Sequence, residues 1–232
     1  MAVSAGFERG NSMRGLFTSL LVAGLSLAGL WQTAAQTAGA PGREIRIVVL
    51  GDSLSAGYQL PAADAFPARL QAALKARGQA VQVDNAGVSG DTSTGGLERL
   101  DWSVGEGTDA VILELGGNDA LRGIDPAITR RNLEAIIERL KARRIPILLA
   151  GMLAPPNMGA AYAEAFNPIF PELAAKYGLI LDPFFLEGVM TVAGMTLPDG
   201  MHPNARGVGV MVERILPKVE DLIAQVRAGR GG

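Results

Sequence analysis

The chain has 232 residues, with 21 basic and 23 acidic side chains and a formal net charge of -2, a length that suggests one domain or at most two. Because 48% of the residues are hydrophobic and 19% are charged, the chain is too apolar to be disordered. It has no cysteine and one histidine, which excludes disulfides and multi-histidine metal clusters, and the near-neutral charge argues against a nucleic-acid partner.

The N-terminus has the pattern of a secretory signal peptide. An uncharged, largely apolar run over 15–31 follows Arg9 and Arg14, and small residues over 33–40 offer cleavage sites. We expect residues 1–35 to be this signal, with cleavage as late as residue 40 and Met1 or Met13 as the true start. About 17 apolar residues are short for an uncleaved membrane anchor. The mature protein is therefore expected to be periplasmic or secreted, of bacterial type, with no membrane span.

Strand and helix patterns alternate along residues 41–232, which we expect to form a single domain. Strands are predicted at 45–50, 81–85, 109–115, 145–150 and 179–182. Helices are predicted at 66–77, around Leu97 and Leu100, at 128–144, at 162–178 with a break near Pro168 and Pro171, and at 207–228. The alternation predicts an α/β fold with a mainly parallel sheet, whose ligand site lies beyond the carboxyl ends of the strands.

Four polar segments lie where this rule places a site. Three follow the first three predicted strands, at 51–55, 85–93 and 116–119, and the fourth, at 199–204, precedes the last helix. The first segment lacks the second glycine of the G-x-S-x-G elbow of ordinary α/β-hydrolases. No phosphate-loop or dinucleotide fingerprint follows the first strand. A flavodoxin-like phosphate loop would leave the fourth segment unexplained.

Ser53 is a candidate nucleophile at a strand-to-helix turn. Alone, a serine after an aspartate is more often a helix cap, and a lone histidine is more often an ordinary surface residue. A serine nucleophile needs a base, however, and the only histidine, His202, comes three residues after Asp199. That spacing lets Asp199 reach Nδ1 and leaves Nε2 free to take the Ser53 proton. Pro203 disfavours helix at His202, so a turn is expected there.

Acyl transfer also needs donors for the developing oxyanion. The candidates are the backbone N–H groups of Ser53 and Gly90 and the side-chain amide of Asn118. Three acidic residues of the loops, Asp52, Asp91 and Asp119, are interpreted as bracing and capping groups because no metal-ligand cluster accompanies them. No metal or organic cofactor is expected.

The four segments together resemble the GDSL, or SGNH, hydrolases. The matching stretches are GDSLSAGY (51–58), NAGVSGDTS (85–93), ELGGNDALRG (114–123) and DGMHPN (199–204). They look closest to the bacterial periplasmic acyl hydrolases described as arylesterase, thioesterase I or lysophospholipase, over roughly residues 44–225. The resemblance implies a three-layer α/β/α flavodoxin-like fold with a five-stranded parallel sheet. It also implies Ser53 as nucleophile, His202 as base, Asp199 as its orienting acid, and an oxyanion hole of Ser53, Gly90 and Asn118.

The expected function is therefore a serine hydrolase of small-molecule acyl esters or thioesters, acting through an acyl-enzyme on Ser53. Apolar residues of nearby loops are candidate walls for the acyl chain: Leu121, Met152, Leu153, Phe184 and Met201. Two alternatives remain open. One is a carbohydrate O-deacetylase of the same fold, and the other is a protein that binds acyl ligands without catalysis.

Overall fold

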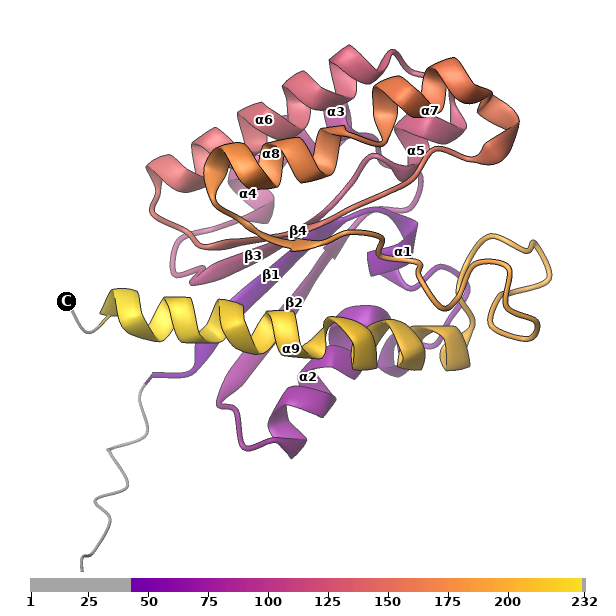
Figure 1. Ribbon diagram of the computed structural model, residues 1–232. Helices are drawn as coiled ribbons and strands as arrows, with labels where there is room; N and C mark the ends of the chain where they lie inside the picture. The colour runs from indigo at the N-terminus through magenta and orange to yellow at the C-terminus, as the bar shows by residue number, and fades with distance from the viewer. Residues whose placement is uncertain (1–42, 231–232) are drawn as a thin grey trace, which may run out of the picture. The chain divides into compact units, whose positions relative to one another are not determined.

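A five-stranded sheet forms the centre of the computed structural model, which describes residues 43–230 (Figure 1). Its strands are β1 (Ile45–Gly51), β2 (Val81–Gly87), β3 (Ala110–Glu114), β4 (Ile147–Ala150) and β5 (Ile180–Asp182). All neighbours pair in parallel, in the order β2-β1-β3-β4-β5, which is the flavodoxin-like order. The expected fold class is confirmed, whereas the predicted signal peptide lies outside the described residues.

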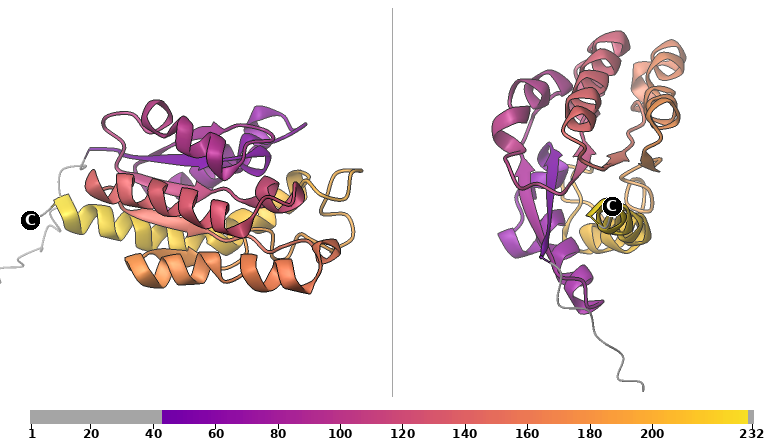
Figure 2. Two further views of the ribbon diagram at one scale, coloured as in Figure 1. Left: turned by 90° about the horizontal axis from the view of Figure 1, so that it is seen from above. Right: turned by 90° about the vertical axis from the view of Figure 1, so that its left-hand side faces the viewer.

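Helices cover both faces of the sheet, which explains why its central strands β1, β3 and β4 are nearly continuous apolar runs. Successive side chains of a strand point to opposite faces, and Val48 and Val49 of β1 are both buried. One layer holds α2 (Phe66–Ala76) and α9 (Ala205–Arg230), and the other holds α3 (Ser93–Glu98), α4 (Leu100–Ser103), α6 (Pro126–Ala142), α7 (Ala160–Phe166) and α8 (Ile169–Tyr177) (Figures 1 and 2). The three-layer arrangement is thus confirmed.

Helix boundaries differ from the prediction where capping side chains and prolines determine the start of a helix. Helix α6 begins at Pro126 because Asp125 accepts the Ala127 N–H as a side-chain cap and proline suits a first helical turn. The break after α7 falls at Pro168 alone. Pro171 lies in the first turn of α8, where its missing N–H costs no helical hydrogen bond.

Two short helices, α1 (Ser53–Ala56) and α5 (Gly117–Leu121), were not predicted as separate elements. Each follows directly on a strand, α1 on β1 and α5 on β3. The strand order reverses between these two central strands, and such a switch point is where open α/β sheets bind ligands. The topology therefore brings two of the polar segments together at the carboxyl edge of the sheet.

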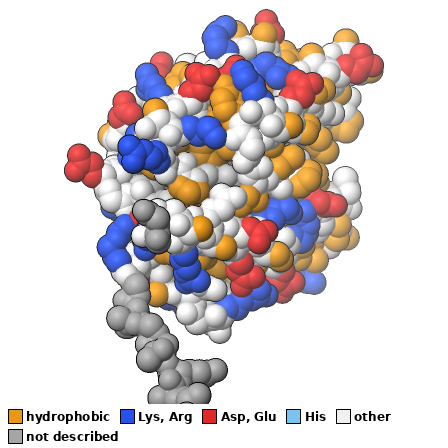
Figure 3. Space-filling view, turned by 60° about the vertical axis from the view of Figure 1, so that its left-hand side comes forward, with side chains coloured by type: hydrophobic (Ala, Val, Ile, Leu, Met, Phe, Trp, Pro, Cys, Tyr) orange, Lys and Arg blue, Asp and Glu red, His pale blue; other side chains and the backbone are white. Residues whose placement is uncertain are grey.

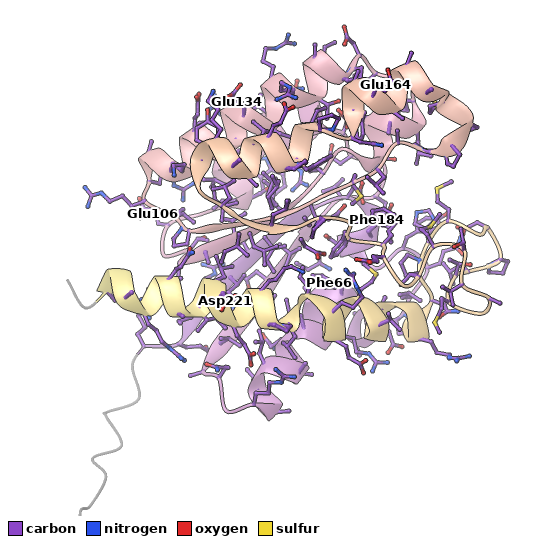
Figure 4. The ribbon with its side chains drawn as sticks, viewed as in Figure 1. Phe66, Glu106, Glu134, Glu164, Phe184 and Asp221 are labelled. Carbon is purple, nitrogen blue, oxygen red and sulfur yellow. The ribbon has the colours of Figure 1, made fainter. Side chains whose placement is uncertain are left out.

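The loops complete this end of the molecule. Short 3-10 turns lie at Ala62–Asp64 and Pro156–Met158, and the long connection from β5 to α9 extends past α1 (Figure 1). Phe184, at the start of that connection, lies at this end, whereas Glu106, just after α4, lies at the opposite end (Figure 4). No helix within residues 43–230 is long and apolar enough to cross a membrane.

Candidate active site

Ser53 is the first residue of α1, at the point where β1 ends. The Asp52 side chain caps this helix by accepting the Leu54 N–H at 3.0 Å. Only 8% of Ser53 is exposed, and the helix N-terminus beneath it favours negative charge. The turn thus presents a nearly buried hydroxyl beside free backbone donors.

The histidine and its aspartate meet this hydroxyl. His202 Nε2 lies 3.0 Å from Ser53 Oγ, and His202 Nδ1 lies 2.7 Å from Asp199 Oδ2. Because a carboxylate accepts only, Nδ1 carries the hydrogen and Nε2 is left with a lone pair facing the hydroxyl. The three side chains therefore form one continuous chain of hydrogen bonds, with the spacing that proton transfer requires.

Asp199 is held in its charged form by the turn that it begins. Its Oδ1 accepts the backbone N–H groups of Met201 and His202 at 2.9 and 3.0 Å. These two bonds, followed by the hydrogen bond and charge of the His202 ring, lower the pKa of Asp199 to about 2. The residues form a turn outside any helix, as expected.

The turn is fixed by Asn204, which follows Pro203. Its amide group donates to the Gly194 and Thr196 carbonyls at 3.0 and 3.1 Å, and its Oδ1 accepts N–H groups at the start of α9. One side chain therefore joins the loop, the turn and the last helix, so the position of His202 is tied to the core.

Tyr58 makes a contact with His202 that the sequence does not reveal. Its ring lies against the His202 ring, with centroids 4.4 Å apart. No sequence pattern links the two residues, which are far apart in the chain. The only available signal was that Tyr58 closes the same segment that contains Ser53.

The three candidate oxyanion donors, Ser53, Gly90 and Asn118, line one pocket. The Asn118 amide donates one N–H to Asp52 Oδ2 at 2.9 Å, which leaves its second N–H for a ligand. Gly90 has a φ of 83°, a conformation that glycine adopts without strain. Its carbonyl accepts from the Arg122 guanidinium at 2.6 Å.

The loop aspartates brace the site, as interpreted from the sequence. Asp91 pairs with Arg99, whose guanidinium also donates to the carbonyls of Gly51 and Ala86 at the ends of β1 and β2. Asp119 is buried and accepts from the Ser93 backbone N–H and hydroxyl and from the Thr129 hydroxyl. No cluster of three or more potential metal-ligating side chains occurs among the described residues.

The buried carboxyl group of Glu114 lies beneath the nucleophile turn, and sequence analysis does not identify it as part of the site. Glu114 is completely buried at the end of β3. Burial and the neighbouring Asp52 carboxyl raise its pKa well above the usual range, and burial raises the pKa of Asp52 to about 6. The available signal was one acidic residue inside a strand that is otherwise apolar.

A pocket of about 670 Å³ opens over Ser53 and His202, a volume typical of small-molecule sites. All five candidate wall residues line it: Leu121, Met152, Leu153, Phe184 and Met201. Further lining side chains are mostly apolar, among them Pro155, Pro156, Leu186 and Met190. The site can therefore hold an apolar group next to the reacting hydroxyl.

The mouth of this pocket is also apolar. Of the seven large hydrophobic side chains that are exposed among the described residues, four line the pocket. Tyr58, Leu121, Leu153 and Met201 line the pocket, and Val88 and Val192 adjoin lining residues in the chain. Trp102 on α4 is the exception. We call the six residues other than Trp102 the apolar rim.

Known proteins resemble this chain over most of its length. The model of the GDSL-like Lipase/Acylhydrolase family matches residues 49–210. Esterase TesA of Pseudomonas aeruginosa is 40% identical over 193 residues, covering 83% of this chain and 92% of its own. An arylesterase of Vibrio mimicus is 42% identical over 160 residues, covering 68% and 80%.

A third relative carries several activities in its name. The thioesterase 1/protease 1/lysophospholipase L1 of Escherichia coli K12 is 38% identical, covering 76% of this chain and 84% of its own. Among solved structures, a crystal structure of TesA superposes with a TM-score of 0.73 at 40% identity, covering 76% of this chain and 99% of that chain.

Proposed function

Since the chain belongs to the GDSL-like lipase/acylhydrolase family and is a serine ester hydrolase, we propose that it cleaves acyl esters and thioesters through an acyl-enzyme on Ser53. The observation that carries this assignment of roles is the chain of hydrogen bonds from Ser53 through His202 to Asp199. It matches the arrangement of nucleophile, base and orienting acid that serine hydrolases use.

The first half of the reaction forms the acyl-enzyme. His202 Nε2 takes the Ser53 proton as Oγ attacks the acyl carbonyl carbon, and the carbonyl oxygen becomes an oxyanion. The imidazolium is stabilised by Asp199, which stays ionised. Collapse of the tetrahedral intermediate breaks the bond to the alcohol or thiol, which leaves with the proton from His202.

The oxyanion is stabilised by donors that the fold supplies before the substrate arrives. These are the backbone N–H groups of Ser53 and Gly90 and the second amide N–H of Asn118. Preorganised donors of this kind are the largest single contribution in many enzymes. In the second half of the reaction, His202 deprotonates a water molecule that attacks the acyl-enzyme, and Ser53 regains its proton as the acid leaves.

The pocket favours an acyl chain over an acetylated sugar. Its walls are mainly aliphatic, aromatic and methionine side chains, and the apolar rim extends this surface outward. A sugar hydroxyl buried against such walls would leave hydrogen bonds unmade, at a cost of about 1–3 kcal/mol each. We therefore propose apolar acyl esters and thioesters as the substrate class. The names arylesterase and thioesterase 1/lysophospholipase L1 of the relatives agree with this choice.

We also propose that the enzyme acts outside the cytoplasm, with residues 1–35 removed as a signal peptide and 41–232 as the mature domain. The support is the basic start, apolar run and small residues of the N-terminal sequence. N-terminal sequencing of the protein from the periplasm or medium tests this, with a start between residues 36 and 41 expected. A chain that keeps residues 1–35 would contradict it.

No nucleic-acid partner is proposed. The balance of 21 basic and 23 acidic residues is poorly suited to phosphate neutralisation. Acidic and basic side chains are also interspersed on the face of the molecule shown in Figure 3.

Hydrolysis of a series of p-nitrophenyl esters, from acetate to palmitate, tests the substrate class. We expect kcat/KM to rise from acetate to medium or long chains and to exceed that for acetylated sugars. Activity confined to acetate and acetylated sugars would favour the carbohydrate O-deacetylase. Tight binding of acyl ligands with no turnover at any chain length would favour the non-catalytic binding protein.

A further inference from the structure

A buried glutamate lies under the nucleophile turn and has no part in the reaction steps described above. Glu114 comes from β3, and its Oε2 accepts the Asp52 backbone N–H at 3.1 Å and the Ser55 hydroxyl at 2.6 Å. A Cβ on Gly51 would lie 2.4 Å from this oxygen. Glycine at that position therefore makes room for the carboxyl group.

The Glu114 and Asp52 carboxyl groups are neighbours at this buried site, and the Asp52 charge raises the pKa of Glu114. Two neighbouring carboxylates at a buried site cannot both stay ionised, because their repulsion adds to the desolvation cost of each charge. No ion pair among the described residues involves either group. One of the two therefore carries a proton.

The surroundings decide which group is neutral. The two Asp52 oxygens accept N–H bonds from Leu54 and Asn118, and such bonds favour the ionised form of Asp52. Glu114 is fully buried, and its Oε1 accepts no hydrogen bond from an N–H or hydroxyl group. Oε1 is thus the Glu114 oxygen that is free to carry a proton.

We propose that Glu114 is a positioning residue that acts as a neutral carboxylic acid. By donating a hydrogen bond to Asp52, it fixes the carboxylate that aligns the Asn118 amide for the oxyanion. Asp52 Oδ2 holds one N–H of the Asn118 amide, so the direction of the second N–H follows from the place of this carboxylate. Asp52 Oδ1 holds the Leu54 N–H in the turn of the nucleophile. One proton on Glu114 therefore orients both the amide and the turn.

Two substitutions test whether Glu114 acts as a neutral hydrogen-bond donor, as a charge, or only by filling space. Glu114→Gln keeps an acceptor for the Asp52 N–H and the Ser55 hydroxyl, and its NH₂ replaces the acid proton as a donor to Asp52. Glu114→Met keeps length and volume but removes both functions. The catalytic part of this inference rests on the proposed function, whereas the protonation of Glu114 does not.

We expect Glu114→Gln to keep kcat within about threefold of the native enzyme for one p-nitrophenyl ester. Glu114→Met should lower kcat about 10²-fold with little change in KM, which is the size of the loss when one oxyanion donor is removed. If Glu114→Gln is as slow as Glu114→Met, an ionised glutamate is required and the inference is wrong. Native kcat in Glu114→Met would show that the residue has no positioning role.

An infrared difference spectrum tests the proton directly, even where Glu114→Met does not fold. At neutral pH the native protein should show the carbonyl stretch of a protonated carboxylic acid, and Glu114→Gln should lack that band. Absence of the band in the native protein would overturn the inference. If the band is present and a Ser53→Ala variant is active, the protonation of Glu114 is supported but the proposed function is wrong.

Discussion

The phenol ring of Tyr58 covers one face of the His202 imidazole, with ring centroids 4.4 Å apart and planes tilted by 35°. The Tyr58 N–H donates to the Ser53 carbonyl at 3.2 Å, so the covering ring is tied to the turn that carries the nucleophile. In the proposed reaction the imidazole becomes a cation against this ring. The aromatic face attracts such a cation by about 0.5–1 kcal/mol at a partly exposed site.

Replacing the ring should slow the reaction. Tyr58→Leu is expected to lower kcat about two- to fivefold, the equivalent of that attraction. Tyr58→Phe keeps the ring and should retain native kcat, so it is the matched control. Steady-state kinetics on a short ester measures both. Equal loss in the two variants would assign the effect to the hydroxyl instead.

The charge of Asp199 should matter more than its shape. In Asp199→Asn the amide oxygen can still accept the backbone N–H groups of the turn, but the NH₂ group would donate to Nδ1 of His202. The imidazole would then carry its hydrogen on Nε2 and could not accept the Ser53 proton. We expect kcat to fall about 10⁴-fold.

The control is Asp221→Asn, on α9 (Figure 4). It removes one acidic charge away from the site and should leave kcat unchanged. A loss of less than tenfold in Asp199→Asn would contradict the role assigned to this aspartate.

The pH dependence follows from which groups gain protons. The pKa of Asp199 is lowered to about 2, so this group is ionised throughout the working range and does not cause a loss at mildly acidic pH. Protonation of His202 removes the base. Burial raises the pKa of Asp52 to about 6, so Asp52 loses its charge as the pH falls through about 6. Activity should therefore fall as pH decreases. A profile of kcat/KM that is flat between about pH 5 and pH 8 would contradict His202 as the base.

The sequence was sufficient for the strands of a mainly parallel sheet and for the main helices because β-branched apolar runs alternate with helical periodicity. It was also sufficient to propose Ser53, Asp199 and His202, since a polar segment after a strand and a single histidine leave few alternatives. These predictions depend on local pattern and on the rule that parallel strands end at one edge.

The rest depended on contacts between distant segments. Glu114 falls within a predicted apolar strand, and its role does not follow from that pattern because its partners, Asp52 and Ser55, come from another segment. The contact of Tyr58 with His202 likewise exists only after β1 and the loop before α9 meet. Short helices such as α1 and α5 are set by caps and tertiary packing rather than by periodicity.

The apolar rim should affect long-chain substrates and leave short ones unaffected. Val88→Ser and Val192→Ser remove exposed apolar side chains next in the chain to the pocket-lining Ser89 and Thr191. Each should raise KM for long-chain p-nitrophenyl esters about two- to fivefold, with acetate unchanged. This corresponds to about 0.5–1 kcal/mol, a partial burial of one valine. Trp102→Ser is the control, because Trp102 is 75% exposed but lies on α4 and does not line the pocket. Equal effects of all three variants would argue against a role of the rim.

Two glycines near the start of α9 should respond oppositely to alanine. A Cβ at Gly207 would lie 2.2 Å from the Met195 carbonyl oxygen, whereas one at Gly209 meets nothing within 4 Å. Gly209→Ala should stabilise the fold by about 0.5–1 kcal/mol, through the better helix propensity of alanine. Gly207→Ala should destabilise it and shift the loop that precedes His202. Thermal unfolding measures both, and the same sign in the two variants would contradict the packing described here.

The most direct test of the account is the turnover of a p-nitrophenyl ester by Ser53→Ala beside the native enzyme, with circular dichroism to confirm that both are folded. If Ser53 forms the acyl-enzyme, kcat should fall about 10⁵–10⁶-fold, to the residual rate that binding and the oxyanion donors alone support. Undiminished turnover in a folded Ser53→Ala protein would contradict the central claim.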